Sequence, residues 1–261
     1  MMTLNTLPAS GETWDSATLP IGQWIGLAGA ALIALLLISR LIQGVLQADR
    51  YRAASTLDDV ARAQLSVAIE QAEKKTNGEI AVVVVERSDR HPAAHWISGL
   101  LWLVLGSALA AHWMPWEQPA LFFCIQLGFG ALGMALALAL PGYRRGLVSE
   151  ERATEMAQEQ SLQEFFGLGL HKTSQGTGVL LFVSLFERRV IVLGDEGIDA
   201  KVEEHLWEQA RNSVLEGVGR GELQSGLQQA VEAIGGVLAA NFPPLEDNPN
   251  ELPNHVIVRR E

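Results

Sequence analysis

The sequence holds three carboxylates in one short turn, Gly194-Asp-Glu-Gly-Ile-Asp199. The turn follows a β-branched run, and α/β sheets place their ligands at the ends of strands. Asp195, Glu196 and Asp199 could offer oxygen ligands to Ca²⁺ or Mg²⁺, and Glu79 would join them if its end of the sheet lies nearby. The alternative is a plain turn in which Asp199 is the N-cap of the next helix. Both interpretations stand: a structural turn, and a divalent-cation site made of these four carboxylates.

Other groups that could do chemistry lack the context that they need. Gly128-Phe-Gly-Ala-Leu-Gly133 matches a dinucleotide-binding pattern, but it lies inside an apolar run, so close helix packing is its predicted role. The six histidines show no zinc-ligand spacing, and a single Cys124 excludes a thiolate cluster. Ser184 has no glycine elbow of the hydrolase kind. We predict no catalytic residue and no cofactor other than Ca²⁺ or Mg²⁺.

The overall charge excludes one class of partner. The formal net charge is −11, and no basic face is concentrated in the sequence. Because binding to phosphate backbones needs such a face, we predict no nucleic-acid partner.

Three long apolar runs, at residues 16–39, 96–113 and 120–140, predict membrane spans. The last two contain roughly 18 to 21 residues without Lys, Arg, Asp or Glu, enough for a helix to cross a ~30 Å hydrocarbon layer. Buried core helices are the alternative, but they are rarely that long without a charge. The first run could also be a secretory signal, but its leader contains Glu12 and Asp15 and no basic residue. We therefore predict an uncleaved anchor and a membrane hairpin.

Cations near the span ends predict the orientation, because Lys and Arg stay on the cytoplasmic side. Arginines occur after the first run and on both sides of the hairpin: Arg40, Arg50, Arg52, Arg87, Arg90, Arg144 and Arg145. The hairpin turn contains only Glu117 as a charged residue. We predict a multi-pass protein of the cell inner membrane with its N-terminus and hairpin turn outside and its soluble domain in the cytoplasm.

The remaining residues fit one α/β domain that the hairpin interrupts. Apolar periodicity predicts helices over residues 57–75, 148–166, 200–215 and 223–238, and strands over 79–85, 178–184 and 188–193. The predicted organisation is an N-terminal tail (1–15), a transmembrane helix (16–39), the first part of the domain (57–92), transmembrane helices (95–113 and 120–141), the second part of the domain (143–240) and a proline-rich C-terminal tail (241–261).

Several segments together resemble the TPM domain family in order and spacing. They are Thr76-Asn-Gly-Glu-Ile-Ala-Val-Val-Val, the predicted pair of strands and the turn after it from Thr177 to Ile198, Trp207, and the run from Gly221 to Ala233-Ile-Gly-Gly. Phe242-Pro-Pro and Asn250-Glu-Leu-Pro253 are similar to the tail of its membrane-anchored bacterial branch, some members of which also carry an inserted hairpin. The resemblance implies a small TPM-like α/β sandwich, interrupted by a transmembrane helical hairpin and preceded by a transmembrane helix.

The resemblance implies several roles and fixes no reaction. The family is linked to photosystem repair in thylakoids, to receptor-accessory roles, and in some members to weak acid phosphatase activity with divalent cations. Bacterial members are often associated with LemA-type proteins. We therefore expect a binding or accessory module in the assembly or maintenance of a membrane protein complex, with a LemA-like membrane protein as partner. A divalent-cation-dependent phosphatase is the alternative.

Overall fold

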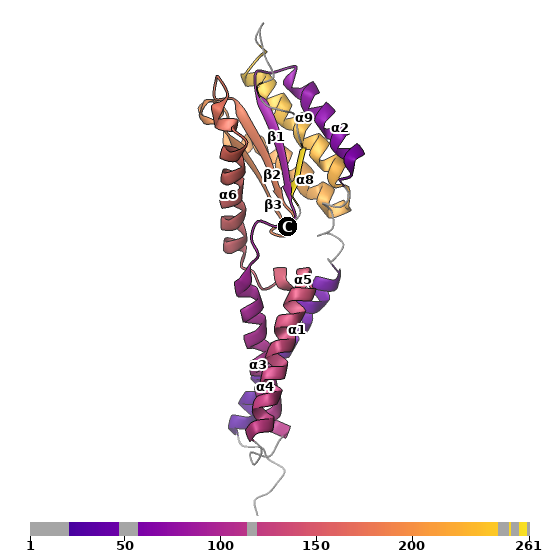
Figure 1. Ribbon diagram of the computed structural model, residues 1–261, viewed down its shortest axis with the longest axis vertical. Coiled ribbons are helices and arrows are strands. Elements are labelled where there is room, and N and C mark those ends of the chain that lie inside the picture. Colours follow the sequence, from indigo (N-terminus) through magenta and orange to yellow (C-terminus); the bar gives the residue numbers. More distant parts are fainter. Residues whose placement is uncertain (1–20, 47–56, 114–118, 245–250, 252–255, 260–261) are drawn as a thin grey trace, which may run out of the picture.

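The computed structural model describes residues 21–46, 57–113, 119–244, 251 and 256–259. Two parts are joined end to end (Figure 1). We call residues 21–46 and 92–145 the stem, and residues 57–91 and 146–259 the head, each as far as it is described. The stem is entirely helical, whereas the head contains the sheet.

The stem is built from three long helices: α1 (Ile21–Leu46), α3 (Pro92–Trp113) and α4 (Pro119–Ala139), followed by the short α5 (Pro141–Arg145). Their segments Ala28–Val45, Pro92–His112 and Pro119–Ala139 are long and apolar enough to cross a membrane. Large apolar side chains are exposed along these helices, including Leu32, Leu35, Leu36, Trp96, Leu100, Phe123, Leu127 and Leu138. An apolar outer surface of this extent is typical of helices that face lipid.

Glycines let the stem helices approach closely. A Cβ atom at Gly133 on α4 would lie only 2.7 Å from the carbonyl oxygen of Ser98 on α3, and Gly130 is also buried. A Cβ at Gly128 would meet open space. The prediction that the glycines of residues 128–133 serve helix packing is therefore confirmed for two of the three.

The head contains a four-stranded sheet in the order β3-β2-β1-β4. The strands are β1 (Glu79–Val85), β2 (Gly178–Ser184), β3 (Arg189–Gly194) and β4 (Val256–Arg259). Strands β2 and β4 both run parallel to β1, and β3 forms an antiparallel hairpin with β2. Strands β1 and β2 are almost completely buried, as their continuous apolar sequences predict for strands that are covered on both faces.

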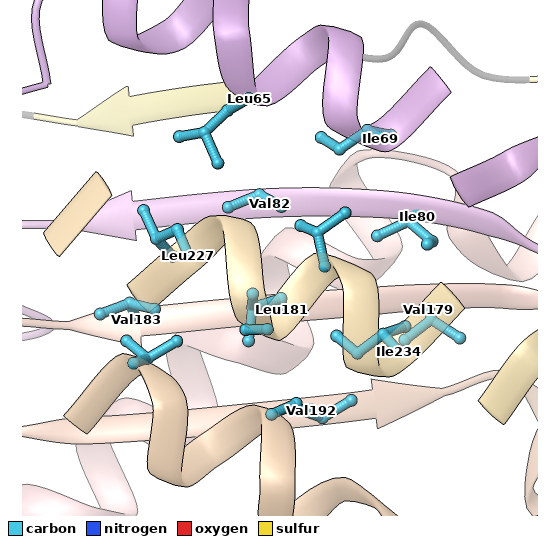
Figure 2. Close-up of a cluster of buried hydrophobic side chains, with 14 of the residues drawn as sticks. Leu65, Ile69, Ile80, Val82, Val179, Leu181, Val183, Val192, Leu227 and Ile234 are labelled. Carbon is cyan, nitrogen blue, oxygen red and sulfur yellow. The ribbon is translucent and has the colours of Figure 1, made fainter. Parts of the chain in front are cut away.

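Helices cover both faces of this sheet (Figure 1). One layer contains α2 (Asp59–Glu73), α8 (Glu208–Arg220) and α9 (Leu223–Asn241), and the opposite layer contains α6 (Glu150–Gly167). Alternate strand residues point to alternate faces. Val82 and Leu181 therefore meet the first layer (Figure 2), whereas Val83 and Phe182 pack toward α6. The head is an α/β sandwich, which confirms the predicted fold class.

The structure differs from the sequence prediction at the C-terminal segment and before α8. Residues 241–261 were predicted to be only a tail, but Val256–Arg259 pair with β1 as strand β4. Its β-branched run, Val256-Ile-Val, was a signal that the surrounding prolines obscured. The helix predicted from residue 200 begins only at Glu208, after the short helices α7 (Glu196–Asp199) and η3 (Glu204–Trp207). Trp207 is buried in the core.

Candidate functional site

The sheet has two ends of opposite character. Residues 86–91 lead from β1 to α3 of the stem, so the last residues of β1 lie at the end of the sheet nearest the stem, which we call the proximal end (Figure 1). Glu79 is the first residue of β1 and therefore belongs to the opposite, distal end. Because β3 is antiparallel to β2, the acidic turn that follows β3 lies at the distal end as well. Glu79 is paired with Gly178, whose carbonyl accepts a hydrogen bond from the Asp195 N–H at 2.9 Å. The four predicted carboxylates therefore share one end of the sheet.

The acidic turn forms a helix cap, but not the predicted one. The carboxylate of Asp195 accepts the N–H of Glu196 at 2.9 Å and is the N-cap of α7, whereas Asp199 is the last residue of that helix. The prediction that Asp199 is a cap is thus wrong, because the chain turns four residues earlier than expected. Burial and the neighbouring charge of Asp195 raise the pKa of Asp199.

The carboxyl group of Glu79 is used within the fold. It is buried, and its Oε1 accepts the backbone N–H of Glu251 at 3.1 Å. Among the residues that the structure describes, no group of three or more His, Cys, Asp or Glu side chains is arranged to hold a metal ion. The cation site of Asp195, Glu196, Asp199 and Glu79 therefore stays a prediction.

A polar loop lies beside the acidic turn. Ser174 donates its N–H and its hydroxyl to the carboxylate of Glu251 at 2.9 and 2.6 Å. Gly176 has a positive φ of 65° and packs against Gly197 so closely that a Cβ at Gly197 would lie 2.6 Å from the carbonyl oxygen of Gly176. This contact holds the loop against the start of α7, and the hydroxyl of Ser174 is already hydrogen-bonded.

The proximal end contains a buried cluster around Glu187, which lies in the turn between β2 and β3. One carboxylate oxygen, Oε2, accepts the hydroxyl of Ser184 and the N–H of Ser88, the latter at 3.0 Å. The other oxygen, Oε1, lies 2.6 Å from Nε2 of His91. Ser88 and Ser184 also hydrogen-bond to each other at 2.9 Å. We call Ser88, His91, Ser184 and Glu187 the joint cluster.

Hydrogen bonds keep the carboxyl group of Glu187 in the joint cluster ionised. Burial by itself raises the pKa of Glu187, but the bonds from His91, Ser184 and Ser88 outweigh it and hold that pKa below its ordinary value. A buried carboxylate with this number of donors is stable as the anion.

His91 connects the cluster to the stem. It directly precedes α3, its backbone φ is 47°, and its ring stacks on Phe186 with centroids 5.3 Å apart. A left-handed conformation at a residue before proline costs of order 1–3 kcal/mol and persists only where the surroundings fix it. The bond to Glu187 and the stack on Phe186 provide that fixation.

Arginines from α5 add a second set of contacts between stem and head. Arg145 donates to the Glu187 carbonyl at 3.3 Å and to the Glu150 carboxylate at 2.9 Å, and Arg189 binds the same carboxylate at 2.7 Å. The guanidinium of Arg144 lies 5.0 Å above the ring of Phe186. Burial and the nearby charge of Arg87 lower the pKa of Arg144. The joint is thus a buried, charged and hydrogen-bonded contact between two parts of the molecule.

The joint cluster contains the residue types of a hydrolase triad, but in an order that cannot activate a nucleophile. A triad needs the histidine between the serine and the acid, so that the imidazole takes the hydroxyl proton. Here Glu187 stands in the middle, and Ser184 and His91 bind its two different oxygens. All three side chains are buried. The arrangement can fix geometry, and it gives no route for acyl transfer.

Comparisons with known proteins found one family model and one solved structure that are similar to this chain. The TPM domain family model matches residues 145–237, which run from the end of α5 through most of α9. The NMR structure of the BA42 protein from the psychrophilic bacterium Bizionia argentinensis is similar at 19% sequence identity, over 77% of this chain and 94% of that chain, with a TM-score of 0.49. No curated protein matches the chain.

Residues 145–237 of this chain are a TPM domain. The predicted resemblance is confirmed for this region. The joint cluster draws Ser184 and Glu187 from it, and Ser88 and His91 from the segment before the stem hairpin.

Proposed function

We propose that this protein is a membrane-anchored TPM-domain module that binds a membrane protein partner and supports the assembly or maintenance of its complex. The joint carries this proposal. The chain passes between head and stem at residues 91–92 and again at 145–146, and the buried, hydrogen-bonded joint cluster lies beside these passages. These contacts hold the head relative to three helices that are apolar enough to span a membrane. A head that is held in one orientation above a membrane suits docking, because little orientational freedom remains to be lost on binding.

The open edge of the sheet is the proposed docking surface. A groove of about 1020 Å³ follows β3, between α6 and the segment from Asp199 to Arg211. Among the described residues, β2 is the only strand that pairs with β3. An edge strand presents unpaired backbone groups that an extended segment of a partner can add to. We infer that a LemA-like membrane protein places such a segment there.

A variant pair tests the docking surface. Leu162 lines the groove and is exposed, and Val60 is exposed on α2 in the opposite layer. Leu162→Arg should reduce the partner recovered in mild detergent about fivefold or more, whereas Val60→Arg should leave recovery unchanged. Equal recovery of the same membrane proteins by both variants would contradict docking at β3.

The proposal also places the head in the cytoplasm and the hairpin turn outside the inner membrane. In a Cys124→Ala background, a cysteine at Glu117 should react with an impermeant thiol reagent in intact cells. A cysteine at Glu204, which is exposed in the head, should react only after lysis. The reverse labelling pattern would put the head outside.

A divalent-cation-dependent phosphatase is the second candidate. One observation favours it: burial and the neighbouring charge of Asp195 raise the pKa of Asp199, and a bound cation would offset both effects. If Ca²⁺ or Mg²⁺ binds, a hundredfold excess over its dissociation constant should stabilise the head by about 2.7 kcal/mol. Changing Asp195 to Asn and Glu196 to Gln should abolish that gain together with hydrolysis of a phosphomonoester. We expect no hydrolysis above background, since the sequence shows no recognised nucleophile motif beside these carboxylates. Metal-dependent turnover that is lost in the double variant would defeat the binding proposal.

A further inference from the structure

A second pocket lies where the stem meets the head. It has a volume of about 420 Å³, and its polar lining includes Arg40 and Gln43 of α1, Arg145 of α5, Glu150 at the start of α6, and Arg188 of the β2–β3 turn. The floor forms because α1 and α5 nearly touch: a Cβ at Gly142 would lie 2.3 Å from the Gly44 carbonyl oxygen.

The charges in this pocket oppose those of the whole chain. Among the described residues that line it, three are arginines and one, Glu150, is a carboxylate, which binds Arg145 and Arg189 at 2.9 and 2.7 Å. Arg145 is buried at the base, while Arg40 and Arg188 are exposed. The lining is thus cationic in a protein whose net charge is −11. Such a pocket attracts an anion and has room for a group of headgroup size.

The position of the pocket identifies the anion. Arg40 lies near the end of the apolar segment Ala28–Val45, and the pocket also borders α5, which follows the apolar segment Pro119–Ala139. If these segments span a bilayer, the pocket lies at the level of the lipid headgroups. Basic pockets between span ends on the cytoplasmic side are where anionic headgroups bind.

We propose that this pocket binds the phosphate of an anionic phospholipid, with Arg40 and Arg188 as the accessible ligands and Arg145 as the fixed base of the site. The inference rests on the membrane placement proposed above and is independent of the protein partner. Bound lipid would bridge α1, α5 and the β2–β3 turn, and so would add a further connection between stem and head.

Lipid retention measured by native mass spectrometry tests the proposal. The full-length protein is exchanged into nanodiscs that contain equal amounts of phosphatidylglycerol and phosphatidylcholine, and the lipid still bound after release is identified. We expect phosphatidylglycerol on the native protein. Arg40→Gln with Arg188→Gln should weaken its retention about 30-fold, since each basic residue near a membrane surface contributes about a fivefold factor.

A matched control removes two cations at the other end of the head. Lys74 and Lys172 are exposed there, and Lys74→Gln with Lys172→Gln should retain phosphatidylglycerol like the native protein. Equal loss in both double variants, or retention in both, would overturn the proposal. Unchanged melting of both variants in detergent without lipid shows that each is folded, because all four side chains are exposed.

A second experiment distinguishes a lipid headgroup from free phosphate as the ligand of the pocket. Dihexanoyl phosphatidylglycerol should raise the melting temperature of the native protein in detergent, and inorganic phosphate at the same concentration should not. If inorganic phosphate stabilises it equally, the pocket is a soluble-anion site and the lipid assignment is wrong. Cysteine labelling that fails at Glu117 would instead remove the membrane orientation itself.

Discussion

The two ends of the sheet use the same residue types for different purposes. At the distal end, Asp195 is half-buried and Glu196 is exposed, and the carboxylate of Asp195 caps a one-turn helix. At the proximal end, Glu187 is completely buried and accepts bonds from three residues that come from both sides of the stem insertion. A cluster of acids in sequence thus marked the exposed end, whereas a single acid forms the better-defined site. Burial and the number of donors, rather than charge density, distinguish the two.

Truncation of Glu187 should have the largest effect. Glu187→Ala leaves His91 and two serines without their acceptor and breaks a buried pair, so we expect a loss of about 3–5 kcal/mol in the free energy of unfolding, measured by urea titration in mild detergent. Glu196→Ala, at the exposed acid of the distal end, should change it by less than about 0.5 kcal/mol. Similar losses at both positions would remove the contrast between the two ends.

Lowering the pH should reduce the contribution of Glu187 to the free energy of unfolding and should increase that of Asp199. The pKa of Glu187 lies below its ordinary value of 4.5 in the folded state, so its contribution is present above that value and is lost as pH falls through the folded-state pKa. The pKa of Asp199 lies above 3.8, so protonation at falling pH relieves the folded state.

Stability between pH 7 and 3 measures this difference. The free energy of unfolding should fall less steeply with decreasing pH in Glu187→Gln than in the native protein. In Asp199→Asn it should fall slightly more steeply. If Glu187→Gln leaves the acid limb of the stability profile unchanged, the carboxylate of Glu187 is not the group that titrates at the joint.

Removal of the helix cap at the distal end should lower the free energy of unfolding less than truncation of Glu187 does. Asp195→Ala removes the acceptor for the Glu196 N–H at the start of α7, and caps of this kind contribute about 1 kcal/mol. Asp195→Asn keeps an acceptor and should retain most of the stability. A loss from Asp195→Ala as large as that from Glu187→Ala would show that the acidic turn has a structural role beyond a cap, which would strengthen the cation-site prediction.

The sequence by itself determined the elements whose signal is local. The apolar runs predicted α3 and α4 to within a few residues, but α1 ends at Leu46, seven residues beyond the predicted end at 39. The β-branched runs predicted β1, β2 and β3 almost to the residue, because the strand period is repeated along the chain. The context of Gly130 and Gly133 inside an apolar run also predicted that they pack against a neighbouring helix, whereas the same prediction failed for Gly128.

Only the tertiary structure decided which residues meet. Ser88 and His91 are separated from Glu187 by 99 and 96 residues, and nothing local to any of them indicates that they will share two carboxylate oxygens. Strand β4 is similarly distant from β1, and its four residues are too short to stand out without a pairing partner. The Arg40, Arg145 and Arg188 pocket likewise needs α1, α5 and the β2–β3 turn to be brought together. Burial and hydrogen-bond satisfaction arise from packing, so a sequence can show which groups are available but not which of them the fold will place beyond the reach of water.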